Sequence, residues 1–293
     1  MNIAFCINRL ALIGLGVTVS SLIRNCSDSK QITLWFLCAG LLKEDKSNIE
    51  QLLANEGFQG KQHCIDFDPV AHFGSFRSLH GDWTPYGRLL LPEILKEDSV
   101  LYLDADLAVE LDVLTLKDVK LENTAIGAVA GAQIKYALEN KFFIEDFNLS
   151  PDDRYFNSGV LLMNLEYWRQ NQIKDKCIEV ARQYSEKLAA VDQTILNALF
   201  SRSFASLPKS FNCPWYADKG RPVVADKMIL HYVGSPKPWD IGAKFLHKGY
   251  RTWQSYLTAE WAKQYGSTAR ADIVRAWNIR RSYLRILKKA IKG

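Results

Sequence analysis

The sequence has few cysteines, and their spacing gives no sign of a disulfide framework or of a metal site built from cysteines. Its six cysteines are scattered, and no two of them form a Cys-x-x-Cys pair. Cys6 and Cys38 lie in apolar runs, where a free thiol packs as a small hydrophobic side chain. We therefore expect free cysteines in a reducing cytosol rather than a disulfide framework.

No apolar run is long enough to cross a membrane as a helix. The run ALIGLGVTVSSLI, residues 11–23, falls well short of the roughly 20 apolar residues that a span needs. It also lacks the cleavage pattern of a signal peptide, so we expect a buried helix there. The chain shows no internal repeat, and its formal net charge of +5 over 293 residues does not indicate a nucleic-acid partner.

What the chain does have is an alternation of strand-like and helix-like segments. Such an alternation predicts an α/β fold with a Rossmann-like, mainly parallel sheet flanked by helices. Runs rich in β-branched and aromatic residues predict strands at 2–7, 31–38, 61–67, 99–104, 125–132 and 155–168. Helical spacing predicts helices at 44–58, 84–98, 170–187 and 192–200.

The fourth predicted strand ends on two carboxylates, Asp104 and Asp106, within LYLDADLAVE. Alternate strand residues point to the same side, so both side chains can converge on one cation while Ala105 turns away. Because the pair has no basic neighbour, a hard divalent cation would neutralise it and leave positions open for phosphate oxygens. Ligands of open sheets bind at the carboxyl ends of the strands. The alternative is a pair of solvated loop acids.

A later segment, HYVGSPKPW, carries side chains that suit such a site. It offers His231 as a third metal ligand, a turn at Gly234, and Lys237 between two prolines. That stiff frame would hold a cation in a fixed place beside a diphosphate. The alternative is a Pro-rich surface loop with an unrelated histidine.

Two further segments place polar side chains at the ends of predicted elements. YFNSGVLLMN puts Asn157 and Ser158 just before a buried strand, and VDQTILNALF puts Asp192 and Gln193 at a helix start. Capping the helix is the commonest role of an aspartate at such a place, so an N-cap is the alternative role of Asp192.

Together these motifs resemble the retaining glycosyltransferases of family 8, which include bacterial lipopolysaccharide and lipooligosaccharide galactosyl- and glucosyltransferases. The resemblance implies a GT-A fold, a manganese-dependent site with magnesium as the alternative ion, and UDP-glucose or UDP-galactose as donor. It also implies transfer of the hexose, with retention of configuration, to a cell-surface glycan such as a lipopolysaccharide core. The matching pieces occur in family order over residues 1–240: NIAFCI, TPYGRLLLPEIL, LYLDADLAVE, YFNSGVLLMNLEYWR, DQTILNALF and HYVGSPKPW.

The resemblance implies roles for particular residues. Asp104, Asp106 and His231 correspond to the metal ligands. The residues implied around the donor sugar as catalytic are Gln193, Asp192 and Asn157. The residues implied as nucleotide-sugar contacts are Cys6, Asn8, His80, Arg88, Ala105, Gly234 and Lys237. We favour attack by the acceptor hydroxyl on the same face of the sugar that the phosphate leaves, with Gln193 polarising the sugar. A covalent route through Asp192 is the alternative.

Two positions depart from the family pattern. Relatives commonly carry Asp-Asp-Asn-Tyr after the first strand, where an acid and an aromatic ring hold uracil. This chain has INRLA there, so Asn8 still offers a hydrogen bond but Ala11 supplies no stacking ring. Gly131 stands where many relatives have an aspartate near the end of a strand. Both departures bear on the donor and not on the fold.

The last residues of the chain are strongly basic. Residues 270–293 contain eight Lys or Arg residues and one acid, Asp272, with Trp277 and aliphatic residues at near-helical spacing. Such a helix suits an anionic membrane surface, while a solvated helix and an RNA-binding patch are the alternatives. We therefore expect a catalytic domain at 1–265 and a membrane-associating tail at 266–293. The protein would lie on the inner face of the cytoplasmic membrane, with a lipid-linked acceptor and no nucleic-acid partner.

Two other functions fit part of the pattern. A haloacid dehalogenase-like phosphatase also ends a strand on Asp-x-Asp, but it does so near the start of the chain rather than on a fourth strand. A non-enzymatic module that binds sugar or membrane would not need His231 and Lys237 beside the aspartates. Hydrolysis of a UDP-sugar would separate the transferase from both.

Overall fold

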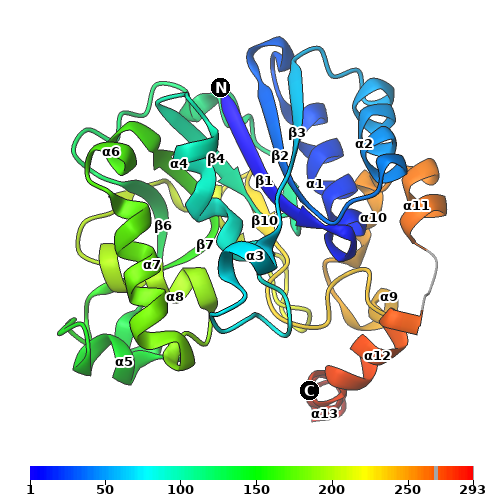
Figure 1. The fold of residues 1–293 in the computed structure, drawn as a ribbon. Helices are drawn as coiled ribbons and strands as arrows, with labels where there is room; N and C mark the ends of the chain where they lie inside the picture. Colours follow the sequence, from blue (N-terminus) through cyan, green and yellow to red (C-terminus); the bar gives the residue numbers. More distant parts are fainter. Residues whose placement is uncertain (267–269, 293) are drawn as a thin grey trace.

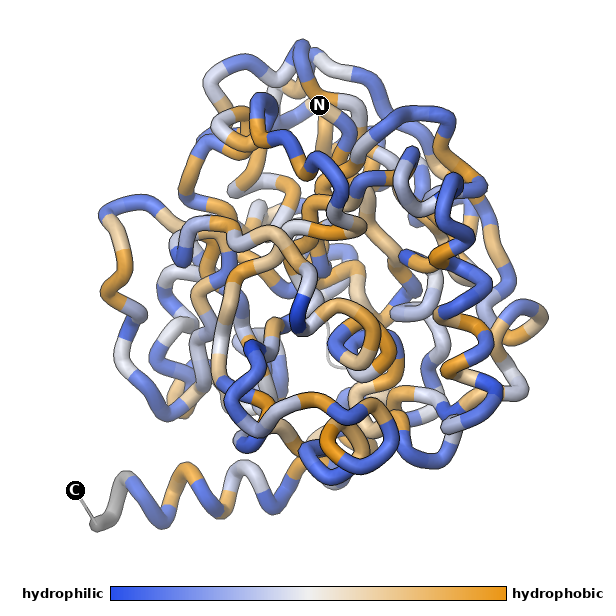
Figure 2. Tube along the Cα trace, turned by 90° about the vertical axis from the view of Figure 1, so that its left-hand side faces the viewer, coloured by the Kyte–Doolittle hydropathy of each residue, from blue (hydrophilic) through white to orange (hydrophobic). Residues whose placement is uncertain are grey.

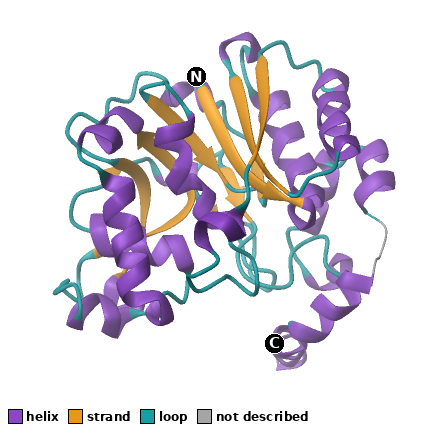
Figure 3. Ribbon diagram, in the orientation of Figure 1, coloured by secondary structure: helices purple, strands orange, loops and turns teal. Residues whose placement is uncertain are grey.

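The structure, a computed structural model, describes residues 1–266 and 270–292 and is built around a seven-stranded sheet. The strand order is β3-β2-β1-β4-β7-β6-β8, and Figures 1 and 3 show helices on both faces. Only β7 runs antiparallel to its neighbours, so the predicted α/β fold with a mainly parallel sheet is confirmed. The strands are β1 (Asn2–Asn8), β2 (Thr33–Ala39), β3 (Lys61–Asp66), β4 (Ser99–Leu103), β6 (Ile126–Gln133), β7 (Arg154–Asn164) and β8 (Ala205–Ser206).

The reversed direction of β7 brings its first half to the carboxyl edge of β4. Leu103, the last residue of β4, pairs with Val160 of β7. The residues just before Val160, Asn157–Gly159, therefore lie beside the residues that follow β4. A parallel strand in this position would have delivered its last residues to this edge instead.

A second, three-stranded sheet continues from the end of β4. It contains β5 (Leu107–Val109), β9 (Cys213–Pro214) and β10 (Ile229–His231), in the order β5-β10-β9. β10 is antiparallel to β5, with His231 opposite Leu107. This register places the end of β10 against the short segment that joins the two sheets.

Helices form the outer layers. The predicted helix at 84–98 is instead the 3₁₀ helix η3 (Thr84–Leu90) followed by a four-residue α-helix, because Pro92 has no N–H to donate to the carbonyl of Arg88. The α-helices are α1 (Leu12–Asn25), α2 (Lys43–Asn55), α3 (Pro69–Phe73), α4 (Leu91–Ile94), α5 (Asn140–Glu145), α6 (Leu165–Gln170), α7 (Ile173–Tyr184), α8 (Val191–Phe200), α9 (Ala243–Leu246), α10 (Tyr250–Tyr256), α11 (Ala259–Tyr265), α12 (Arg270–Asn278) and α13 (Arg280–Lys292).

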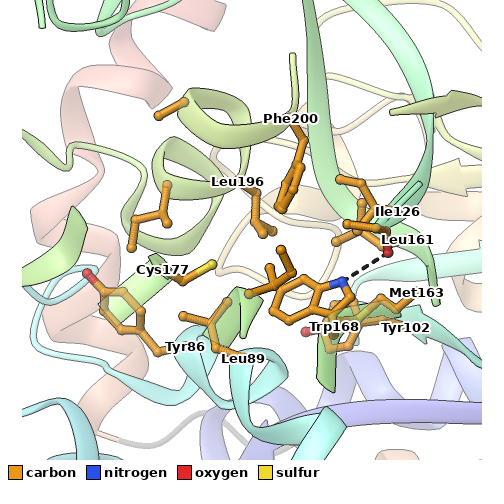
Figure 4. Packing of buried hydrophobic residues seen from close by; sticks show 14 of the residues in the cluster. Tyr86, Leu89, Tyr102, Ile126, Leu161, Met163, Trp168, Cys177, Leu196 and Phe200 are labelled. Carbon is orange, nitrogen blue, oxygen red and sulfur yellow. Dashed lines mark hydrogen bonds between the residues drawn. The ribbon is translucent and has the colours of Figure 1, made fainter. Parts of the chain in front are cut away.

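Two hydrophobic cores lie on the two faces of the sheet. Along β1, Ile3 and Phe5 belong to the core under α1 and α2, whereas Ala4 faces the core under α6, α7 and α8, as the period of two in a strand requires. Figure 4 shows the second core around Trp168, whose indole N–H donates to the carbonyl of Ala125 at 2.9 Å. All six cysteines are free, as expected.

The first core is closed by a helix from near the C-terminus. Trp261 of α11 is 3% exposed, and its indole N–H donates to the carbonyl of Leu12 at 2.8 Å. The ring lies so close to α1 that a Cβ at Gly16 would come within 2.2 Å of it, so this position requires glycine. The buried helix expected at 11–23 is thus confirmed as α1.

The basic segment forms two helices, α12 and α13, within residues 270–292. Figure 2 shows α13 at the edge of the molecule, with polar and apolar residues alternating along it. It contacts α9, and Lys289 forms an ion pair with Asp218 at 2.6 Å. Among the helices of the described residues, none combines the length and apolar character needed to traverse a bilayer.

Candidate active site

Asp104 and Asp106 lie on the bend that joins β4 to β5. Two backbone bonds fix this bend: Asp104 N donates to Gly159 O at 2.8 Å, and Tyr232 N donates to Asp106 O at 3.0 Å. The aspartates follow β4 instead of ending it, so the strand geometry expected for them is wrong. Their carboxylates still converge, because strands of both sheets hold the bend in place.

His231 completes a group of three side chains. It ends β10 beside the bend, and one ligand atom each from Asp104, Asp106 and His231 lie within 4.8 Å of one another. Gly159 of β7 makes this approach possible, since a Cβ there would lie 2.3 Å from the His231 ring and 2.7 Å from an Asp104 oxygen. The three residues predicted as metal ligands are thus brought together.

The ring of His231 is oriented by Asn212, a residue that the sequence analysis missed. His231 Nδ1 lies 3.0 Å from Asn212 Oδ1. This oxygen can only accept, so Nδ1 carries a proton, and in the neutral ring Nε2 presents a lone pair. Nε2 faces Asp106 Oδ1 at 3.1 Å, and this oxygen is buried without a hydrogen-bond partner among the described residues. Two such acceptors repel unless a cation binds both, so the residues present fit a metal ion.

Each carboxylate has a basic partner that is distant in sequence. Asp104 Oδ1 accepts from Arg88 Nη2 at 3.0 Å and from the Tyr102 hydroxyl at 2.8 Å. Asp106 Oδ2 accepts from Lys237 Nζ at 2.6 Å. Burial opposes ionisation of Asp106, but the Lys237 ammonium lowers its pKa well below the usual range. The expectation of no basic neighbour is therefore wrong, because it considered only residues adjacent in sequence.

Arg88 is a buried cation that joins several parts of the site. Its side chain is 3% exposed, and its Nη1 donates to Ser158 O at 2.6 Å. Its Nε lies 3.1 Å from Asp192 Oδ2, and Asp192 is also 3% exposed. Burial raises the pKa of Asp192 to about 6, although Arg88 opposes this shift.

Asp192 is not an N-cap. α8 begins at Val191, and its N-cap residue is Ala190, whose N–H donates to Glu139 Oε1 at 2.8 Å. Asp192 therefore lies inside the first turn and points to Arg88. The alternative structural role is wrong because the buried guanidinium is a stronger partner for the carboxylate than the uncharged N–H groups of the helix start.

A chain of amides connects α8 to the histidine. Gln193 Oε1 accepts from Asn157 Nδ2 at 2.9 Å, and Gln193 Nε2 donates to the Tyr155 hydroxyl at 2.6 Å. Asn157 Oδ1 accepts from Asn212 Nδ2 at 3.0 Å, which fixes the orientation of the Asn212 amide. The structure therefore brings the predicted catalytic residues next to the predicted metal ligands.

Asn8 and His80 lie on another edge of the site. Asn8 Oδ1 accepts from Ala11 N at 3.1 Å, and its Nδ2 donates to Asp82 Oδ2 at 2.9 Å. His80 is exposed in a tight turn, Leu79–Asp82, where it has a left-handed φ of 57°. Asp82 is a second residue that the sequence analysis missed, and it gives this edge a carboxylate although β1 ends on an amide.

The remaining predicted contacts surround the bend. Cys6 is half-buried, and burial raises the pKa of its thiol, which keeps it neutral. The carbonyl of Ala105 faces α1, where a Cβ at Gly14 would lie 2.4 Å from it. Gly234 has a left-handed φ of 73° in the turn that leads to Lys237.

The sequence and the fold match known proteins. Residues 2–242 match the family described as glycosyl transferase family 8. The lipopolysaccharide 1,3-galactosyltransferase of Salmonella typhimurium is 27% identical over 251 residues, which cover 81% of this chain and 72% of that protein. The lipopolysaccharide 1,2-glucosyltransferase of Escherichia coli is 28% identical over 265 residues, covering 85% and 76%. The crystal structure of the galactosyltransferase LgtC with donor and acceptor sugar analogues has a TM-score of 0.74 and 26% identity, covering 92% of this chain and 98% of LgtC.

A fold that matches a galactosyltransferase, in a chain that matches a glycosyltransferase family over most of its length, defines a sugar-transferring enzyme. The chain belongs to glycosyl transferase family 8. The family resemblance read from the sequence is confirmed, and so is the predicted enzyme class. Neither the phosphatase nor the non-enzymatic binding module is favoured by these matches.

Proposed function

We propose that this protein is a metal-dependent, retaining hexosyltransferase that moves glucose or galactose from a UDP-sugar to a cell-surface glycan such as a lipopolysaccharide core. One observation carries the proposal: His231 Nε2 faces an unpartnered oxygen of Asp106, with Lys237 beside it. A divalent cation would satisfy both ligand atoms, and the ammonium adds a second positive charge for a diphosphate. The galactosyl- and glucosyltransferase relatives support a hexose donor.

We favour manganese over magnesium as the ion. The ligand set contains one imidazole nitrogen and two carboxylates. Magnesium prefers oxygen ligands in a strict octahedron, whereas a transition metal accepts imidazole as well as carboxylate. When bound, the ion would stabilise the negative charge that develops on the departing diphosphate.

The residues of the chain have distinct roles in this proposal. Lys237 would bind the diphosphate, exchanging its present partner, Asp106, for the substrate. Gln193 and Asn157 would orient the hexose through their amides. Asp192 is buried against Arg88, which is a poor arrangement for a nucleophile and supports same-face attack over a covalent route.

The nucleotide part of the donor would lie along the edge that contains Asn8 and His80. Asn8 presents an amide whose orientation is fixed by Asp82 and by the backbone of Ala11. Other residues proposed to contact the nucleotide sugar are Cys6, Arg88, Ala105 and Gly234. Among these, Arg88 donates to protein oxygens, so we expect it to act on the donor through Asp104.

The tail extends the proposal to an anionic membrane. α13 exposes the cations Arg281, Arg285 and Lys288 beside the apolar Leu284. α9 contacts α13 and carries Phe245, which is 80% exposed. A basic amphipathic helix binds anionic headgroups, so residues 266–293 would attach the enzyme to the inner face of the cytoplasmic membrane, near a lipid-linked acceptor.

Donor hydrolysis tests the enzymatic proposal. We expect release of UDP from UDP-glucose or UDP-galactose in the presence of Mn²⁺, and loss of this activity in EDTA. Asp104→Asn and Asp106→Asn should each lower the rate by roughly 100-fold or more, since a metal ion supplies several kcal/mol of stabilisation. Asp226→Asn, at an exposed carboxylate, is the matched control. Full activity in EDTA would contradict the proposal.

Sedimentation with vesicles tests the membrane proposal. The full chain should sediment with anionic vesicles but not with neutral ones, and added salt should release it. Reversing two exposed charges, in the double variant Arg281→Glu and Lys288→Glu, should abolish sedimentation without changing UDP release. Equal binding to neutral and anionic vesicles would show that the tail does not bind membranes through their negative charge.

A further inference from the structure

The loop that carries Lys237 is closed by a buried carboxylate. Lys237 N donates to Asp240 Oδ2 at 2.6 Å, and Asp240 N donates back to Lys237 O at 3.1 Å. The Asp240 side chain is 4% exposed. A carboxylate so deeply buried needs a cationic partner to remain charged.

That partner is Arg275, on α12 of the tail. Arg275 Nε donates to Asp240 Oδ1 at 2.6 Å, and Nη2 donates to Oδ2 at 3.1 Å, so the guanidinium spans both oxygens. Oδ2 is the same oxygen that accepts from Lys237 N. The ion pair of the tail and the turn around Lys237 thus share one atom.

α13 contacts the same loop from a second position. The Tyr283 hydroxyl donates to the carbonyl of Ile241 at 2.8 Å, one residue after Asp240. At the other end of the loop, Lys237 Nζ is held by Asp106 and by the carbonyl of Tyr232. A displacement of the loop would therefore move the ammonium away from the metal ligands.

We propose that Arg275 is a positioning residue, which acts through Asp240 to hold Lys237 in place for the diphosphate of the donor. The tail then contributes to donor binding as well as to membrane attachment. This inference rests on the UDP-sugar function proposed above. A guanidinium that only anchored α12 would change the stability of the tail but would not change UDP binding.

The test measures UDP affinity by calorimetry with the full chain at saturating Mn²⁺. Arg275→Met removes the charge and keeps most of the side-chain length. We expect it to weaken UDP binding by about tenfold, within the range of coupling between residues that share a network. Arg285→Met, at an exposed arginine of the same tail, is the matched control and should change the affinity by less than about twofold.

A double-mutant cycle separates positioning from anchoring. In a Lys237→Met background, Arg275→Met should have little further effect, because the residue that it positions is gone. Losses of the same factor in both backgrounds would overturn the inference. If Arg275→Met does not fold, Arg275→Lys replaces it in the cycle, since a single ammonium cannot span both oxygens of Asp240.

The wild-type measurement distinguishes the two proposals. Absence of Mn²⁺-dependent UDP binding by the wild type would overturn the proposed function and this inference with it. Normal binding by the wild type and by Arg275→Met would overturn the role of Arg275 alone.

Discussion

Asp104 and Asp106, the two aspartates of the proposed metal site, are two residues apart, but different parts of the molecule hold them. Asp104 is held on its buried side by Arg88 of η3, which is 3% exposed, and by Tyr102 of β4, which is 1% exposed. Asp106 is held from outside by Lys237, on a loop that the tail contacts. The inner side of the site is therefore part of the core, whereas the outer side depends on segments near the C-terminus.

This difference indicates that the surroundings of the two carboxylates have different roles, one in stability and one in donor binding. The guanidinium of Arg88 is buried and also pairs with Asp192, so it cannot turn from the protein to a ligand without breaking a buried ion pair. Lys237 has to exchange its partner if it is to reach a diphosphate. We therefore expect changes on the inner side to affect the stability of the fold. Changes on the outer side should affect the binding and hydrolysis of the donor.

The largest effect is expected from Arg88→Met, which breaks the inner side. It leaves Asp104 and Asp192 without their buried cation, so the free energy of unfolding should fall by roughly 3 to 5 kcal/mol. Urea denaturation measures this change. Arg202→Met, at a pair that is 54% exposed on the arginine side, should cost less than about 1 kcal/mol. Equal costs would show that burial does not distinguish the two pairs.

Lys237→Met should have the opposite signature. It should raise the activation free energy of donor hydrolysis by roughly 2 to 4 kcal/mol through lost charge stabilisation, and it should lower the unfolding midpoint less than Arg88→Met does, because its ion pair is less deeply buried. Steady-state kinetics and thermal denaturation provide the two readouts. Lys244→Met, at an exposed lysine on the neighbouring helix, controls for lost surface charge. Unchanged kinetics would mean that Lys237 only stabilises its loop.

The buried carboxylate of Asp192 should make stability depend on pH. Its pKa in the folded protein is about 6, above the ordinary value of 3.8, so the folded state retains a proton that the unfolded state has lost. Stability should therefore decrease as pH rises from about 4 to about 6, by roughly 2 to 3 kcal/mol. Comparing urea denaturation of the wild type and Asp192→Asn across this window measures the effect. A wild type that gains stability relative to the variant would contradict it.

A smaller effect is expected where the two sides meet, at Asn212. Asn212→Leu removes the acceptor that fixes the tautomer of His231, so Mn²⁺ affinity should fall by roughly 10- to 100-fold, as for other residues that orient metal ligands. Calorimetric titration with Mn²⁺ measures this change without any donor present. Wild-type affinity in this variant would show that the ring is oriented by its packing alone.

The smallest effect is expected at Ala11, near the end of β1, which belongs to neither the inner nor the outer side of the site. Ala11→Tyr should restore a ring near the end of β1 and tighten UDP binding by about 1 kcal/mol, as base stacking does elsewhere. Leu10→Tyr, at a neighbouring position that is 72% exposed, is the control. Weaker UDP binding by Ala11→Tyr would show that another side chain already fills this space.

The sequence was sufficient for the parts of the site that local motifs encode. Strand alternation predicted the sheet, and LYLDADLAVE together with HYVGSPKPW predicted the three converging ligands. The pairing of Asp104 with Arg88 and of Asp106 with Lys237 was missed, because adjacency in sequence says nothing about partners 16 or 131 residues away.

Two other residues show why the remainder could not be predicted. Asp192 has the local pattern of an N-cap, and only the buried guanidinium of Arg88, on the neighbouring 3₁₀ helix η3, determines its actual role. Asn212 lies in no recognisable motif, and its role depends on a side-chain bond to His231 across 19 residues. Tertiary contacts of this kind decide the role of a side chain against its local structural preference, and they produce no periodic pattern in the sequence.

The bond between Trp261 and Leu12 spans 249 residues and has a consequence for synthesis of the chain. A ribosome completes every strand of both sheets before it reaches α11, the helix that covers α1. Until then the glycine-lined surface around Gly16 lacks the indole that fills it. Nascent chains that pause before Trp261 should therefore keep an apolar surface open to chaperones and proteases, and the native state should form only late in translation.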